Sequence, residues 1–157
     1  MPETKNKFLA SRWAVLLFIA ICFAVSSFGA LFTPGDWYAN LNKAPWSPPN
    51  MAFPIVWTFL YLMIAVAGWL IFRFGNTRLQ VLWIIQLIVN AAWSWIFFGQ
   101  HWVLIGLVEI VLLCVLVLVV ILEARKQELP NVVWLLSPYL LWLILATTLN
   151  AYVVLFN

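Results

Sequence analysis

The chain has 157 residues, of which 66% are hydrophobic and only 8% are charged, and its mean hydropathy is +1.05. Soluble domains carry about 25% charged residues, so this composition predicts an integral membrane protein without a separate soluble domain. The net charge of +3 does not indicate a nucleic-acid partner, because the eight basic residues are scattered and flank apolar runs, as is typical at a membrane surface. Cys22 and Cys114 lie in apolar runs without CxxC or Cys/His spacing, so neither a disulfide framework nor a metal site is expected.

Five apolar runs are each long enough to cross about 30 Å of hydrocarbon at roughly 1.5 Å per residue. They predict an all-α membrane protein that forms one transmembrane domain over residues 1–157, a bundle of five helices in a lipid environment. Short links favour antiparallel packing of the later helices. The expected helices cover about residues 9–32, 51–73, 79–99, 102–123 and 131–156.

The loop at residues 33–50 is the only long segment between apolar runs. Proline fixes φ and removes an amide donor, so Trp46-Ser47-Pro48-Pro49 predicts a stiff extended turn. Aromatic residues such as Tyr38 and Trp46 are frequent here, whereas disordered connectors are poor in them. We therefore favour an ordered lid over a cavity; the alternative is a connector whose aromatic side chains lie among lipid headgroups.

The basic residues predict the orientation of the bundle. Five spans place the N-terminus and the links after the second and fourth helices on one side, which holds seven of the eight basic residues, while Lys43 lies on the other. The positive-inside rule then predicts a cytoplasmic N-terminus, an external lid and an external C-terminus, in a multi-pass protein of a bacterial cell membrane. The seven residues are Lys5, Lys7, Arg12, Arg73, Arg78, Arg125 and Lys126.

Polar and aromatic side chains gather in the outer halves of the predicted helices. Asn90 and Trp93 share one face of the third helix, and Trp142, Ala146 and Asn150 share one face of the fifth. Amides facing lipid are costly, so they should face a cavity or bond between helices. We expect one pocket beneath the lid, and its predicted ligand-binding residues are Tyr38, Trp46, Trp57, Asn90, Trp93, Trp142, Ala146 and Asn150.

The eleven tryptophans fall into two groups. Those near helix ends, among them Trp69 and Trp83, are explained by the aromatic belt at membrane interfaces. Trp57, Trp93, Trp95 and Trp142 lie too deep for that explanation. Their flat indole faces suit stacking on a large planar apolar ligand, and close packing between helices is the weaker alternative.

Two titratable residues stand apart from this group. Glu109 is the single acid inside a predicted span, where an ionised carboxylate costs about 3 kcal/mol at the membrane centre. It should be protonated, partnered or turned inward; a packing or interface role is favoured, and a proton relay is the alternative. His101, in the tight link before the fourth helix, has no neighbouring ligand to complete a metal site and is expected at the surface.

Several segments together form a recognisable pattern over nearly the whole chain. In this order they resemble the TspO/MBR family, the tryptophan-rich sensory proteins and translocator proteins, which include the mitochondrial peripheral benzodiazepine receptor. The segments are WY at 37–38, LNK at 41–43, WSPP at 46–49, Trp57, NAAWS at 90–94, FFG at 97–99, PYLLW at 138–142 and ATTLN at 146–150.

The resemblance implies a five-helix cavity closed by the first loop, with porphyrins, haem, sterols and synthetic benzodiazepine-site ligands as ligands and no required cofactor. Family members are also implicated in tetrapyrrole efflux, stress signalling and light-dependent porphyrin breakdown. Sterol binding is not favoured here, because the recognition pattern survives only as Leu149 and Tyr152, with no basic residue after them. By the same resemblance, Trp57 and Trp142 match cavity tryptophans associated with porphyrin chemistry, and Tyr38, Trp46, Asn90 and Ala146 match cavity or lid positions.

The leading hypothesis is a membrane sensory or translocator protein that binds porphyrin or haem. One alternative is a light- and oxygen-dependent porphyrin-degrading enzyme with Trp57 and Trp142 as candidate catalytic residues. The other is a proton-coupled transporter of a small hydrophobic solute that uses Glu109. A homodimer is a further hypothesis, because small residues permit close helix approach; these are Ala91, Ala92, Gly99 and Gly106.

Overall fold

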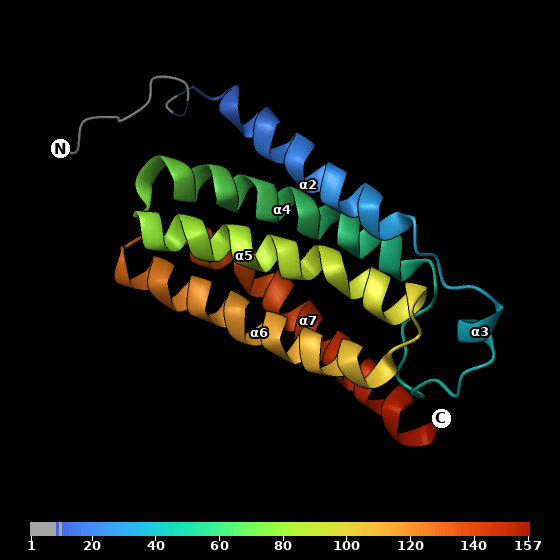
Figure 1. The fold of residues 1–157 in the computed structure, drawn as a ribbon. Coiled ribbons are helices and arrows are strands. Elements are labelled where there is room, and N and C mark those ends of the chain that lie inside the picture. Colours follow the sequence, from blue (N-terminus) through green and yellow to red (C-terminus); the bar gives the residue numbers. More distant parts are fainter. Residues whose placement is uncertain (1–8, 10) are drawn as a thin grey trace.

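A computed structural model describes residue 9 and residues 11–157 of the chain. All regular elements of the described part are helical (Figure 1). They are α2 (Ala14–Ala30), α3 (Asp36–Ala39), α4 (Ala52–Phe74), α5 (Thr77–Ser94), the π-helix η1 (Trp95–Gly99), α6 (Val103–Lys126) and α7 (Pro130–Phe156).

Four helical segments are long and apolar enough to cross a membrane, namely α4, α5 together with η1, α6 and α7. The fifth apolar helix, α2, has 17 residues and is shorter. At about 1.5 Å per residue it covers roughly 26 Å, a little less than a typical hydrocarbon core. The described residues thus form four candidate spans and one shorter apolar helix.

The helices form a bundle in which α4, α5, α6 and α7 close a ring (Figure 1). α6 packs on α5 and α7, and α4 packs on α7 and α5. α2 lies along the outside of this ring, against α4 and α5. The loop at residues 33–50, called the lid below, contains α3 and lies at the same end of the bundle as the C-terminus.

At the end of the bundle away from the lid, the link before α5 is hydrogen-bonded to the link after α6. The Asn76 side-chain oxygen caps α5 by accepting a hydrogen bond from the Leu79 backbone amide (2.9 Å). The Asn76 backbone amide donates to Gln127 Oε1 (3.0 Å). Lys5 and Lys7 lie outside the described residues. The described basic residues at this end are Arg12, Arg73, Arg78, Arg125 and Lys126.

The half of the bundle away from the lid is closely packed. Gly68 of α4 lies directly against the Trp83 ring of α5 and near Phe18 of α2. Trp83 is 2% exposed and its indole donates to the Ile64 carbonyl oxygen (3.2 Å). The prediction of an interfacial Trp83 is therefore wrong, because the missing side chain at Gly68 makes room for the indole inside the bundle.

Two of the small residues that motivated the dimer hypothesis pack within the chain. A methyl group at Gly99 would lie 2.9 Å from Phe32, and one at Gly106 would lie 3.1 Å from Phe97 and 3.4 Å from Asn150. These glycines allow close approach between helices of one bundle, so they do not by themselves indicate a surface for a second copy.

Candidate functional site

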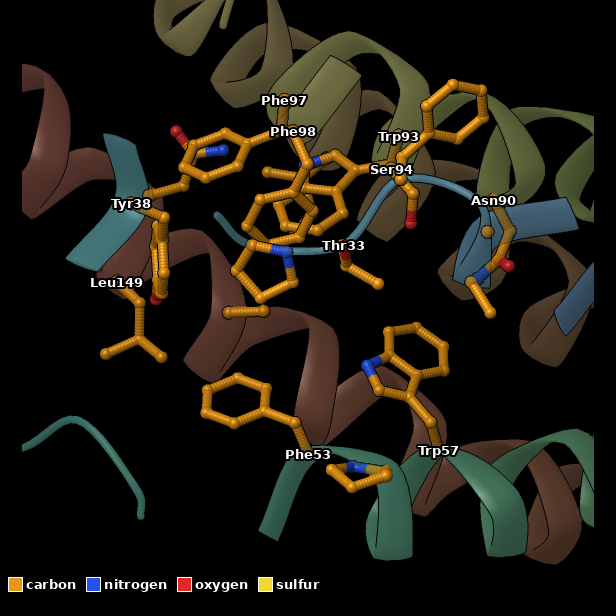
Figure 2. A pocket seen from close by; sticks show the side chains of 18 of the residues that line it. Thr33, Tyr38, Phe53, Trp57, Asn90, Trp93, Ser94, Phe97, Phe98 and Leu149 are labelled. Atoms are coloured by element: carbon orange, nitrogen blue, oxygen red, sulfur yellow. The ribbon is translucent and has the colours of Figure 1, made fainter. Parts of the chain in front are cut away.

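A cavity of about 530 Å³ lies in the half of the bundle next to the lid (Figure 2). Its lining comes from α2, the lid, α4, α5, η1, α6 and α7. The volume falls within the range of about 300–1,000 Å³ that is common for small-molecule sites. The cavity exists because the helices that pack closely at one end leave space at the other, where the lid forms a roof.

Aromatic side chains form much of the wall. In Figure 2, Phe53 and Trp57 of α4 face the space from one side, and Tyr38 of the lid lies on the other. Phe53 meets Trp142 of α7 edge to face, with ring centroids 5.6 Å apart. Trp93 stacks on Phe97 at 4.9 Å. These contacts leave broad indole and phenyl surfaces around one space, which suits a large apolar ligand.

The π-helix η1 extends the cavity-lining face of α5. Trp93 and Ser94 line the cavity one turn before Phe97 and Phe98, so successive lining residues occur in the regular helix as well. η1 spans Trp95–Gly99, and both phenylalanines line the cavity. Such short π segments occur frequently at functional sites.

A chain of hydrogen bonds crosses the bundle below the aromatic walls. Tyr61 of α4 donates to Asn90 Oδ1 (2.7 Å), and Asn90 Nδ2 donates to Tyr139 Oη of α7 (2.8 Å). All three side chains are buried, and Tyr61 and Asn90 also line the cavity. Asn90 therefore joins three helices and also faces the cavity. Its position is compatible with both roles considered from the sequence, bonding between helices and lining the cavity.

Other polar groups of the cavity have no hydrogen-bond partner among the described residues. They are the indole nitrogens of Trp93 and Trp142 and both amide atoms of Asn150. A buried polar group without a partner costs about 1–3 kcal/mol. These polar atoms are themselves buried, so they lie behind the apolar wall of the cavity and not on its surface.

The lid contacts the bundle at several places. Near η1, Trp37 stacks on His101 at 4.1 Å with an angle of 13° between the rings, and its ring also meets Phe97 at 5.8 Å. Near the C-terminus, the Asn42 backbone amide donates to Asn157 Oδ1 (2.8 Å). Burial raises the pKa of the Tyr38 phenol above its usual value, so this lid residue is a neutral hydroxyl at neutral pH.

The chain matches the model of the TspO/MBR family over residues 18–155. It belongs to the TspO/MBR family. It is 39% identical over 142 residues to the tryptophan-rich protein TspO of Chlorobaculum tepidum, covering 85% of this chain and 89% of that protein. It is 33% identical to the tryptophan-rich sensory protein of Cereibacter sphaeroides, covering 88% of each chain. It is 32% identical to the human translocator protein, covering 90% of this chain and 89% of that one.

Seven of the eight residues predicted from the sequence line the cavity of this TspO/MBR-family chain. Two of them, Trp57 and Trp142, are also the candidate catalytic residues, and any chemistry of a ligand here would take place beside their indoles. Ligand contact itself stays a prediction for each residue. The seven are Tyr38, Trp57, Asn90, Trp93, Trp142, Ala146 and Asn150.

Trp46 is the predicted residue that does not line the cavity. It is 53% exposed, donates from its indole to Thr148 Oγ1 (3.2 Å) and meets the Tyr152 ring at 5.6 Å. Thr148 is itself exposed on α7. Trp46 therefore ties the lid to the outside of α7. It lies in a turn closed by the Ser47 backbone amide, which donates to the Ala44 carbonyl oxygen (2.9 Å).

The structure adds lining residues that were missed. Phe53 lies one turn before Trp57, so helical spacing could have identified it. Ser26 and Gly29 of α2 also line the cavity, but α2 is apolar on all sides and carries no signal for them. Phe98 lies about two turns after Asn90 on the same face, so helical spacing could have identified it too.

Glu109 and His101, the two titratable residues singled out from the sequence, lie outside the cavity lining. Of the three expectations for Glu109 (protonated, partnered or turned inward), the structure shows the third, because the side chain is buried inside the bundle. Its carboxylate has no partner among the described residues. Gln86 is likewise buried without a partner. His101 is exposed apart from its stack on Trp37. Within the described residues, no group of three or more His, Cys, Asp or Glu side chains could hold a metal ion.

Proposed function

We propose that this membrane protein of the TspO/MBR family binds a planar tetrapyrrole, porphyrin or haem, in the cavity beneath the lid. The observation that carries the proposal is a cavity of about 530 Å³ lined by aromatic side chains from the lid, α4, α5, η1 and α7. Flat indole and phenyl faces stack on a conjugated ring. The family names of the relatives, sensory protein and translocator protein, agree with a role in ligand detection or transfer.

We further infer that α2 completes a bundle of five membrane-spanning helices in a bacterial cell membrane, with the lid outside. Synthetic benzodiazepine-site ligands are proposed to enter the same cavity and compete with porphyrin. We also propose that the protein can form a homodimer. The dimer would play no part in forming the cavity, which lies within one chain. Sterols and nucleic acids are not proposed as ligands.

A cavity-filling substitution tests the proposal. Ala146 lines the cavity and is half-buried, so Ala146→Phe places a ring in the proposed binding space. We expect protoporphyrin and haem to bind the purified wild-type protein with a shifted Soret absorbance band, and Ala146→Phe to weaken both affinities by at least about tenfold, or about 1.4 kcal/mol.

The matched control is Ala20→Phe, because Ala20 is exposed on α2 and does not line the cavity. This variant should bind as the wild type does. Absence of porphyrin and haem binding by the wild type, or equal binding by Ala146→Phe, would contradict the proposed function.

A further inference from the structure

The cavity carries one positive charge at its lid. Lys43 is the single charged residue among the described residues that line it. The ammonium donates to the Ala39 carbonyl oxygen (3.4 Å) and lies 4.8 Å from the centroid of the Tyr38 ring. Both neighbours are uncharged, so neither neutralises the ammonium, and the half-buried side chain stands between the cavity and water.

The rest of the lining is uncharged. The deep polar groups are amides, phenols and indoles, including Asn90, Tyr61 and Trp142. The site therefore has an aromatic, neutral interior and a cation at its roof. A wholly apolar ligand would gain nothing from Lys43, whereas a ligand anion would form a charge-assisted hydrogen bond, which is about twice as strong as a neutral one.

We propose that the cavity selects amphipathic carboxylates, with the planar body inside and the carboxylate on Lys43. This inference rests on the proposed function and names the feature of the tetrapyrrole that is recognised. In protoporphyrin, both propionates extend from one edge of the ring. That edge then faces the lid, and the opposite, apolar edge faces the hydrogen-bond chain of Tyr61, Asn90 and Tyr139.

Lys43 also has a simpler role, since its hydrogen bond to Ala39 is to the last turn of α3. A cation there stabilises the helix end by a few tenths of a kcal/mol to about 1 kcal/mol. Loss of that role would affect every ligand equally. Only loss of carboxylate recognition changes the ratio of affinities between an acid and its ester.

The experiment measures this ratio by titrating protoporphyrin and its dimethyl ester into the protein in an uncharged detergent. An exposed ion pair contributes up to about 1 kcal/mol, so the wild type should prefer the free acid by about fivefold. Lys43→Met should bring the ratio of the two affinities to about one, and Lys43→Arg should retain the preference. The preference should also shrink as salt screens the pair.

The matched control is Lys126→Met, which removes an exposed lysine at the far end of α6. It should leave the ratio at the wild-type value. Phosphatidylglycerol in mixed micelles supplies the other anion available in a membrane, a lipid phosphate. It should not displace the free acid, because it lacks a planar body for the aromatic walls.

The outcomes separate the two proposals. Equal affinity of the wild type for acid and ester, an unchanged ratio in Lys43→Met, or equal weakening of both ligands in that variant overturns carboxylate recognition and leaves tetrapyrrole binding intact. If phosphatidylglycerol displaces the acid but not the ester, Lys43 binds a lipid headgroup, and carboxylate recognition is overturned. Failure of both porphyrins to bind the wild type overturns the proposed function itself.

Discussion

Asn90 shows how one side chain can serve both the packing and the cavity. Its amide accepts from Tyr61 and donates to Tyr139, so each of its two polar atoms is used once in a buried setting. Asn150 lines the same cavity with both amide atoms unpartnered. The difference follows from the neighbours: phenols from two other helices reach Asn90, whereas Asn150 lies beside Gly106, which has no side chain to offer.

At this scale we predict that Asn90→Leu destabilises the protein. The change leaves two buried phenols without their partner, each at a cost of about 1–3 kcal/mol, so the free energy of unfolding should fall by about 2–6 kcal/mol. Denaturant or thermal unfolding in detergent measures it. Gln100→Leu, at an exposed amide in the link after η1, is the control and should change stability little. Equal stability of the two variants would show that the hydrogen-bond chain is not structural.

The helices differ in how closely they approach along their length. At the end away from the lid, Gly68 lets α4 approach the Trp83 ring of α5, with Phe18 of α2 on the same side. At the lid end, bulky side chains such as Phe53 and Trp57 hold the helices apart and leave the cavity. Tight packing at one end thus positions the aromatic walls at the other.

We predict that Gly68→Ala lowers stability by about 1–3 kcal/mol, the usual cost of overpacking a core. The added methyl group would overlap the Trp83 ring, and Trp83 cannot easily move because it is buried and its indole donates to Ile64. The matched control is Gly35→Ala in the lid, where a methyl group meets nothing within 4 Å. Thermal unfolding should separate the two variants, and a neutral Gly68→Ala would mean that the bundle adjusts without strain.

The whole molecule is asymmetric in charge as well as in packing. Lys43 stands at the lid end, while five described basic residues lie at the other end of the bundle or just before α2. The positive-inside rule applied to this distribution places the lid outside the cell. The cavity mouth would then face the periplasm or the external medium rather than the cytoplasm.

Cysteine labelling tests this orientation in a background in which Cys22 and Cys114 are replaced by alanine. Asn40→Cys in the lid and Thr77→Cys at the start of α5 are both exposed positions at opposite ends of the molecule. An impermeant maleimide should label Asn40→Cys in intact cells and Thr77→Cys only after permeabilisation. The reverse pattern would overturn the orientation.

The sequence by itself determined the features that depend on local chain physics. Apolar runs longer than about 20 residues predict membrane-spanning helices whatever their neighbours are, and helical spacing places Asn90 with Trp93 and Trp142 with Ala146 on shared faces. The structure brings these residues to one cavity. Proline and aromatic content likewise predicted an ordered loop at residues 33–50, and in the structure this loop contacts the bundle through Trp37, Asn42 and Trp46.

Only the tertiary structure decided how these faces meet. It turned Trp46 out to Thr148, took Trp83 into the core against Gly68, and placed Ser26 and Gly29 of α2 on the cavity wall. Each outcome depends on the rotation and separation of neighbouring helices, which arise from packing between segments far apart in sequence. Periodicity within one helix carries no information about the partner it will face, so the sequence predicted the lining faces but not the gap between them.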